Sequence, residues 1–207
     1  MRTTSNQKYE ITEISHEKYP FLHRIRALRE VSAEVRAGDL GGFVESESNL
    51  SFEPDDTAWI FDDAIACNDA YVDKGAVLRG EVVVCDNAYI SMGAVLSGHA
   101  RVEDNAYVRG AVLNASARAS GFSMILNDKD TMGVPILSGH CAVYGKVSGD
   151  VRLTGSALVI SGEEIRNDTL DTLVISGKNR SVIRDSSRDE LASQQPAPSP
   201  PQETERL

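Results

Sequence analysis

The chain has 207 residues, a formal net charge of −10 at pH 7 and few aromatic residues, which make up 6% of the total. This length suits one domain with a small appendage. The negative charge argues against direct binding to nucleic acid or to an anionic membrane, because neutralising phosphates requires clustered Lys and Arg.

Two features of the sequence favour a cytoplasmic location. No apolar run is long enough to span a bilayer, and the first ten residues contain no apolar signal core. The three cysteines, Cys67, Cys85 and Cys141, form no CxxC pair and no paired framework, which suits a reducing compartment. We therefore expect a cytoplasmic protein.

The N-terminal segment, residues 1–39, predicts a hairpin cap. Residues 9–12 and 22–28 have the composition of two short strands around a turn at HEKYP. Such a hairpin would cover the open end of the coil that follows, which would otherwise expose an unpaired strand edge. The glycines in residues 35–50 match neither GxGxxG nor GxxxxGKS/T, so this segment predicts a turn into the first coil and no phosphate-binding loop.

Residues 60–113 divide into nine consecutive hexads without a gap. The first position of each hexad is aliphatic and the fifth is small and apolar. The first positions are Ile60, Ala66, Val72, Leu78, Val84, Ile90, Leu96, Val102 and Val108, and the fifth are Ala64, Ala70, Ala76, Val82, Ala88, Ala94, Ala100, Ala106 and Val112. A six-residue period is typical of a parallel β-helix, in which each hexad supplies one short strand and one corner.

The third and fourth positions of every hexad include Gly, Asn or Asp, which tolerate left-handed backbone angles and form turns at little cost. Three such corners close a triangle, so eighteen residues make one coil, and coils stack at about 4.8 Å. The pattern predicts an all-β fold, in which residues 40–160 form a left-handed parallel β-helix of hexapeptide repeats.

LHRIRALREV at 22–31 and VRAGDLGGFVESESNLS at 35–51, running into the hexads, resemble the YdcK-like group of hexapeptide-repeat proteins, many of which are assigned as acyltransferases. The resemblance covers roughly residues 8–160. It implies a left-handed β-helix, a trimeric assembly and acyl transfer from acetyl-CoA. It transfers no catalytic residue onto this sequence.

After Leu113 the hexad period is lost, and we expect residues 114–136 to form a loop insertion that leaves the coil. The period returns at residues 137–160, where the later part follows a frame slipped by two residues. The sequence LVISG occurs at 158–162 and again at 173–177, which predicts closing strands within 161–185.

The C-terminal tail, residues 186–207, is polar and rich in Pro, so we expect it to be disordered.

Residues eighteen apart should stack in columns, and two apolar columns occupy the outward sixth position. They contain Tyr71, Tyr89 and Tyr107, and Val77, Val95 and Leu113. Apolar ladders that face solvent indicate a contact surface, most simply an interface of a homo-oligomer, with a trimer favoured. The alternative is that these ladders pack beneath the loop insertion or the C-terminal strands.

A third column contains Asp63, Glu81 and His99, in which a carboxylate one step from an imidazole could orient a general base. His140 repeats the LSGH context of His99. It would stack directly on His99 if the insertion re-enters at the same corner, or lie on the next corner if residues 114–119 first complete a side. His99, His140 and Glu81 are the catalytic candidates if the protein is an enzyme; otherwise they are solvated corner residues. Their spacing predicts no metal site.

Two functions follow from these observations. We favour a rigid acidic scaffold that is not catalytic, binds itself and a protein partner, and needs no cofactor. Its charge could imitate nucleic acid toward a host protein, as an inhibitor from a mobile element would. The alternative is an acetyl-CoA-dependent acyltransferase with a histidine base between subunits and the 114–136 loop as a lid. The chain lacks the Asn-Pro-Ala-Lys-like segment common where such enzymes hold CoA.

Overall fold

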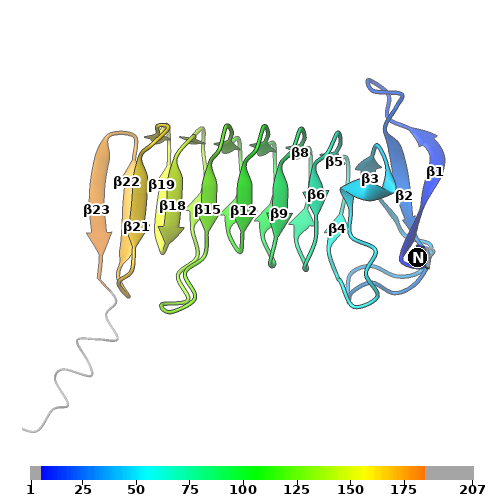
Figure 1. Cartoon of the computed structure of the whole chain (residues 1–207), viewed down its shortest axis with the longest axis horizontal. Coiled ribbons are helices and arrows are strands. Elements are labelled where there is room, and N and C mark those ends of the chain that lie inside the picture. The colour runs from blue at the N-terminus through cyan, green and yellow to red at the C-terminus, as the bar shows by residue number, and fades with distance from the viewer. Residues whose placement is uncertain (1–5, 185–207) are drawn as a thin grey trace, which may run out of the picture.

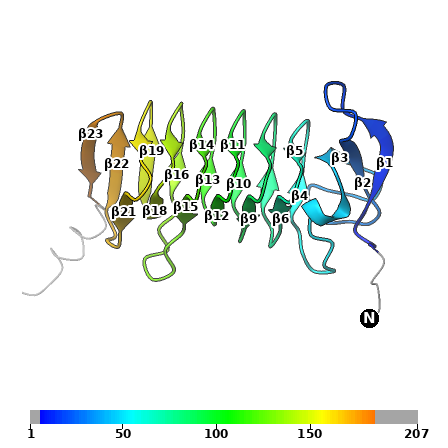
Figure 2. The ribbon, with the colours of Figure 1, turned by 45° about the horizontal axis from the view of Figure 1, so that its top comes forward.

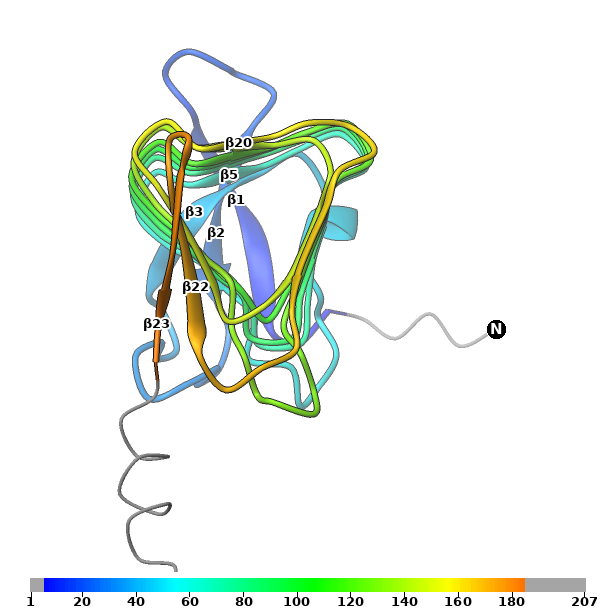
Figure 3. The same cartoon turned by 90° about the vertical axis from the view of Figure 1, so that its left-hand side faces the viewer.

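The computed structural model describes residues 6–184 and is a parallel β-solenoid of about seven turns. The coils stack along one axis, with the N-terminal hairpin at one end and β22 and β23 at the other (Figures 1 and 2). Seen along the axis, the coils superimpose on a three-sided outline (Figure 3). The predicted parallel β-helix with a hairpin cap is therefore confirmed.

Each side of the prism is one sheet. The first sheet contains β1 (Tyr9–Ser15), β2 (His23–Ala27), β3 (Leu40–Val44), β5 (Ile65–Ala66), β8 (Val83–Val84), β11 (Arg101–Val102), β14 (Arg118–Ala119), β17 (Ala142–Val143) and β20 (Leu158–Val159). The second contains β4 (Trp59–Ile60), β7 (Val77–Leu78), β10 (Val95–Leu96), β13 (Val112–Leu113), β16 (Ile136–Leu137), β19 (Val151–Thr154), β22 (Thr172–Ser176) and β23 (Asn179–Ile183). The third contains β6 (Tyr71–Val72), β9 (Tyr89–Ser91), β12 (Tyr107–Arg109), β15 (Met124–Leu126), β18 (Lys146–Gly149) and β21 (Glu164–Asn167). A short 3₁₀ helix, η1 (Glu47–Asn49), lies in the first coil between β3 and Leu50, which forms a parallel bridge with Val72.

The core is a column of aliphatic side chains with alanines at its corners. Val72, Ile90 and Val108 follow one another in the third sheet and are fully buried. The small residues at the fifth position, such as Ala76 and Ala94, are fully buried as well. Both inward positions of the hexad are therefore confirmed, except at the fifth position of the ninth hexad, where Ala111 is buried and Val112 is half-buried.

The corners use left-handed backbone at the third position of all nine hexads. These residues have φ between +48° and +74° and are Asp62, Asn68, Lys74, Gly80, Asp86, Met92, Gly98, Asp104 and Gly110. Lys74 and Met92 are each followed by a glycine that also has positive φ. Residues other than Gly, Asn and Asp adopt this conformation at a cost in free energy. The glycine that follows Lys74 or Met92 adopts its own positive φ without a Cβ clash, so only one residue of the corner is strained.

Aspartates at the corners also join one coil to the next. Asp86 accepts a hydrogen bond through Oδ2 from the amide of Asp104 at 3.1 Å, and Asp104 accepts one through Oδ2 from the amide of Gly121 at 2.8 Å. Asp62 does the same for the amide of Gly80 at 2.8 Å. The corner carboxylates thus bind amides that point along the axis, and the columns of Asn and Asp stabilise the stack.

The predicted loop at 114–136 is wrong for its first half. β14 and β15 lie within it and extend the first and third sheets in parallel register. Only residues 127–135 leave the coil before β16 resumes the second sheet. The cause is a coil of seventeen residues: Val95 pairs with Val112 and Leu96 with Leu113, so residues 112–126 are displaced by one from the eighteen-residue frame.

The same displacement corrects the second apolar column. Leu113 continues the inward Leu78–Leu96 column and is fully buried, so it is a core residue and not part of an outward surface. Val112 takes the outward place that the sequence had assigned to Leu113.

The hairpin joins the coil through an antiparallel-to-parallel change. β1 pairs antiparallel with β2, β2 pairs antiparallel with β3, and β3 pairs parallel with β5. A Cβ on Gly42 would lie 2.4 Å from the Ala64 carbonyl oxygen, so the glycine there permits close packing of β3 on the coil. This is why the glycine-rich segment is a strand entry and not a phosphate loop.

At the opposite end, β22 pairs parallel with β19 and antiparallel with β23. The predicted closing strands are therefore present, although the first LVISG copy supplies β20 of the coil. The third sheet continues through β21 to Asn167, beyond the predicted boundary at 160. The tail predicted to be disordered, 186–207, lies outside the described residues.

We predict that Asp104→Ala lowers the unfolding free energy by about 1–2 kcal/mol, because it removes the bond to the Gly121 amide and places alanine at a left-handed position. Asp104→Asn, which keeps an acceptor and tolerates this conformation, should cost much less. Urea unfolding measures both. Asp69→Ala is the control, since Asp69 is exposed at the neighbouring corner position. Equal losses for Asp69→Ala and Asp104→Ala would show that the corner bond contributes nothing.

Lys8 gives a second prediction. It is 1% exposed and donates from Nζ to the Ser51 carbonyl at 2.8 Å, and burial lowers the pKa of Lys8 to about 8, partly offset by Asp56. Between pH 8 and 10.5 the unfolded chain then holds more protons at this residue, so its contribution to stability rises with pH. Lys8→Met removes this dependence. The free energy of unfolding of the variant, taken relative to that of the wild type, should therefore fall by about 2 kcal/mol as the pH rises from 7 to 10.5.

Chemical denaturation of both proteins at several pH values measures this difference, in which all other titrating groups cancel. A difference that does not change with pH would contradict a buried, proton-binding Lys8.

Candidate functional site

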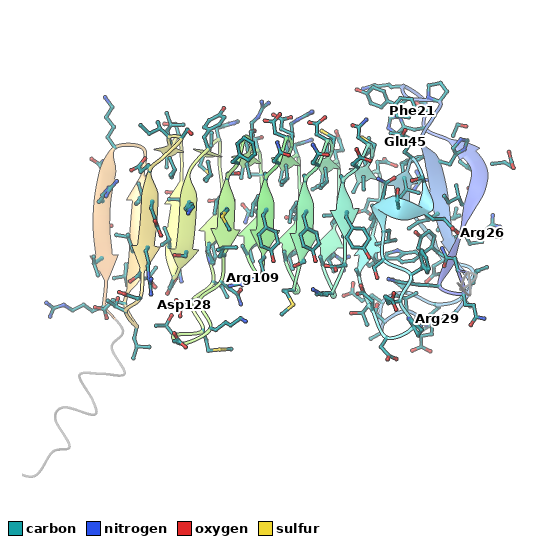
Figure 4. The ribbon with its side chains drawn as sticks, in the orientation of Figure 1. Phe21, Arg26, Arg29, Glu45, Arg109 and Asp128 are labelled. Carbon is teal, nitrogen blue, oxygen red and sulfur yellow. The ribbon has the colours of Figure 1, made fainter. Side chains whose placement is uncertain are left out.

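A groove of about 790 Å³ lies between the hairpin and the outer face of the first sheet. Its wall is the β1–β2 turn and its floor is formed by β5, β8, β11 and β14. The hairpin projects beyond the prism, with Phe21 at its tip (Figure 4). The groove is lined by Ile14, Ser15, His16, Glu17, Lys18, Tyr19, Arg24, Phe43, Asp63, Ile65, Glu81, Val83, His99, Arg101, Ser116 and Arg118.

A small apolar cluster outside the main core fixes the hairpin on the sheet. Leu22, Phe43 and Ile65 are buried against one another, and Val83 packs beside them. The cluster exists because β3 brings Phe43 onto the outer face of the sheet, next to Ile65 of β5. This apolar packing fixes the position of the hairpin, and therefore of the groove wall, relative to the sheet.

Arg24 closes the inner end of the groove. Its guanidinium donates from Nη1 to the carbonyls of Gly41 at 3.0 Å and Asp62 at 2.8 Å, and from Nη2 to Asp63 Oδ1 at 2.7 Å. It also lies over the Phe43 ring, 4.2 Å from the centroid. This arginine and Asp63 satisfy each other, so Arg24 is a structural cation rather than a free one.

Two further arginines lie side by side on the floor. Arg101 of β11 and Arg118 of β14 are in parallel register, and Arg101 is half-buried while Arg118 is exposed. Arg101 Nε lies 3.5 Å from Glu103 Oε2. Among residues 6–184, no carboxylate lies within ion-pair distance of Arg118. Like charges on neighbouring strands repel each other and destabilise the ladder. An anion bound between the two arginines would relieve this repulsion.

The structure brings two of the three catalytic candidates together. His99 Nδ1 lies 3.4 Å from Glu81 Oε2, and both line the groove. Their side chains are 66% and 71% exposed, so water screens this pair and its stabilising effect is small.

His140 does not join this pair, and both predicted positions for it are wrong. It lies at the corner of His99 but two coils farther on, with Ser116 between them: the Ser116 amide donates to Gly139 and the His99 amide to Ala115. At roughly 4.8 Å per step, the two histidines are about 10 Å apart. The cause is again the coil completed by residues 114–126.

His16 lies in the groove although its spacing gave no signal in the sequence. Its Nδ1 accepts hydrogen bonds from the amides of Lys18 at 3.1 Å and Tyr19 at 3.2 Å, so the neutral ring carries its proton on Nε2. The ring stacks on Tyr19, with centroids 5.2 Å apart, and meets Phe43 edge-on at 4.8 Å. The turn therefore presents an ordered aromatic wall.

The cysteines are not candidate nucleophiles. All three are free, and burial raises the pKa of Cys67 to about 11, of Cys85 to about 12 and of Cys141 to about 11. Since the thiolate is the reactive form, these thiols are inert at neutral pH.

The tyrosine column forms a continuous stack on the third sheet. Tyr71, Tyr89 and Tyr107 are in register, and the ring centroids lie 5.9 Å and 5.1 Å apart with interplanar angles of 21° and 8°. The Tyr89 hydroxyl donates to Asp73 Oδ2 at 2.9 Å. Burial, followed by this bond, raises the pKa of Tyr89. The rings are half-buried, so their outer surface remains available.

An aliphatic column runs along the second sheet. Val77, Val95, Val112 and Ile136 are in register and half-buried. At its N-terminal end the column continues into Trp59, which is 1% exposed and meets Tyr9 edge-on at 6.3 Å. The cap therefore covers the start of this column and leaves the remainder open.

Two kinds of site lack support in the described part of the chain. Within residues 6–184, no three His, Cys, Asp or Glu side chains gather where they could hold a metal ion. No helix in that range is long and apolar enough to cross a membrane.

Comparison of the chain with protein-family models and with curated proteins finds no match.

Proposed function

We propose that this protein is a non-catalytic binding scaffold, in which a rigid β-helix presents a groove and two apolar ladders. The observation that carries the proposal is the exposure of the His99–Glu81 pair. A general base is made effective by burial and by neighbours that tune its proton affinity, and this pair lies open to water on a corner. The inert cysteines leave no alternative nucleophile of that type in residues 6–184.

Self-association is part of the proposal. The tyrosine and aliphatic ladders lie on adjacent sides of the prism, and each presents in-register apolar side chains that are only half-buried. Aromatic and aliphatic ladders of this kind favour interfaces between copies. A three-fold arrangement is the simplest in which one copy contributes its tyrosine side and its neighbour the aliphatic side. A protein partner would then meet the exposed first sheet.

The alternative function is an acetyl-CoA-dependent acyltransferase, as the resemblance to the YdcK-like group implies. The observation in its favour is that His99 and Glu81 line the same groove as the two arginines of the floor, so a base and a site for anionic groups are neighbours. The wide separation of His140 from this pair counts against a two-histidine site.

Thermal unfolding with and without millimolar acetyl-CoA separates the two functions. A scaffold should show no acyl transfer to amines or hydroxyls, and no shift in melting temperature that depends on His99. An enzyme that binds acetyl-CoA should melt at a higher temperature by mass action, with turnover that His99→Ala abolishes. His140→Ala is the matched control, because this histidine lies on the same corner outside the groove. Turnover by the wild type and by His140→Ala, but not by His99→Ala, would overturn the scaffold proposal.

We also predict that Val95→Glu and Tyr89→Glu convert an oligomer into a monomer, because each places a charge in the middle of an apolar ladder. Size exclusion with light scattering measures the mass. Arg152→Glu serves as the control for the second sheet, since it substitutes an exposed outward residue past the end of the aliphatic ladder. If the wild type is monomeric at high concentration, the interface does not exist.

A further inference from the structure

We propose that the groove beside the hairpin binds a small organic oxyanion, a carboxylate or phosphate carried on a flat apolar body. The inference deepens the proposed binding function by naming a class of ligand, and it rests on that function. It is carried by three features of one surface: a cationic end, an aromatic wall and an apolar floor.

The cationic end is formed by Arg101 and Arg118. The two residues are in register on neighbouring strands about 5 Å apart, so their side chains start close enough to reach one oxyanion. Arg101 Nε lies 3.5 Å from Glu103 Oε2, and Glu103 also accepts a hydrogen bond from the Ser120 hydroxyl at 3.2 Å. Glu103 therefore neutralises Arg101 in part, while the Arg118 guanidinium has no carboxylate within ion-pair distance in residues 6–184.

The carboxylates along the groove do not cancel this charge. Asp63 is bound by Arg24, and Glu81 faces His99. Four cationic side chains line the groove with three carboxylates, and Glu103 beside Arg101 is a fourth, so the groove is close to neutral in a chain of net charge −10. The local excess of positive charge lies at Arg118, which has no carboxylate within ion-pair distance in residues 6–184.

The rest of the groove suits an apolar body. Val83 is exposed in part on the floor, and the stacked rings of His16 and Tyr19 form the wall. Tyr19 is 47% exposed, so one face remains open for contact with a planar group. The volume of about 790 Å³ lies within the range typical of sites for small organic ligands.

Binding can be measured by NMR titration of the full chain with phenyl phosphate and with benzoate. Inorganic phosphate and phenol test the charge and the ring separately. We expect the two aromatic anions to bind and to shift backbone amides of β11, β14 and residues 16–19. Arg118→Ala should weaken binding about tenfold or more, because it removes a charge-assisted hydrogen bond. Arg152→Ala, which removes an exposed arginine outside the groove, should leave binding unchanged.

Tyr19→Ala should weaken both aromatic anions and leave inorganic phosphate unaffected. Tighter binding of phenyl phosphate than of benzoate identifies a phosphate site, and the reverse identifies a carboxylate site. Equal weakening by Arg118→Ala and Arg152→Ala would overturn the proposal, since it would show attraction by net charge alone. The absence of shifts with either aromatic anion at 10 mM, in a wild type with native amide dispersion, would overturn it as well.

These outcomes are distinct from failure of the proposed function. Acetyl-CoA carries phosphates, so it could raise the melting temperature by occupying this groove without turnover. A shift that Arg118→Ala removes, with no acyl transfer, supports both the oxyanion site and the scaffold. Turnover that His99→Ala abolishes would refute the scaffold, while the NMR titration would still test the oxyanion site by itself.

Discussion

The structure depends on one constraint: each coil satisfies its main-chain groups with the next coil along the axis. The Val77 amide donates to the Ala94 carbonyl, the Val95 amide to Ala111 and the Val112 amide to Pro135. Because a strand of two residues cannot bury its apolar side chain alone, stability comes from stacking. The same bonds fix the register, so side chains with the same place in successive coils form columns that can pack, stack or repel.

Each candidate surface is a direct result of these columns. The tyrosines stack because parallel register places them one step apart, and the two arginines lie together for the same reason. The groove adds a feature that the repeat cannot supply. Its wall comes from the hairpin, which reaches the outer face of the first sheet through Leu22, Phe43 and Ile65. A regular scaffold and an irregular cap together create a groove in which cations, aromatic rings and apolar side chains meet.

The sequence predicted what the repeat determines and failed where the repeat changes by one residue. Hexads up to Arg109 were assigned correctly because corner and core residues lie within six positions of each other. At Gly110 a corner closes with one residue fewer, which moved Leu113 into the core and hid the coil formed by 114–126. The Arg101–Arg118 pair was missed for the same reason, since these residues are seventeen apart. The packing of Leu22 on Phe43 depends on distant segments and leaves no periodic signal.

The central claim is that successive coils align in register along one axis, and a spin–spin distance tests it most directly. Labels at Asp69 and Ser161, in a variant with the three native cysteines replaced, occupy one corner at the two ends of the first sheet. The registers Ala66–Val84, Val84–Val102, Val102–Ala119, Ala119–Val143 and Val143–Val159 separate them by five steps. At roughly 4.8 Å per step, the account predicts a narrow distribution centred near ~24 Å. A broad distribution, or a mean well above ~35 Å, would contradict the stacked coil and with it every column described above.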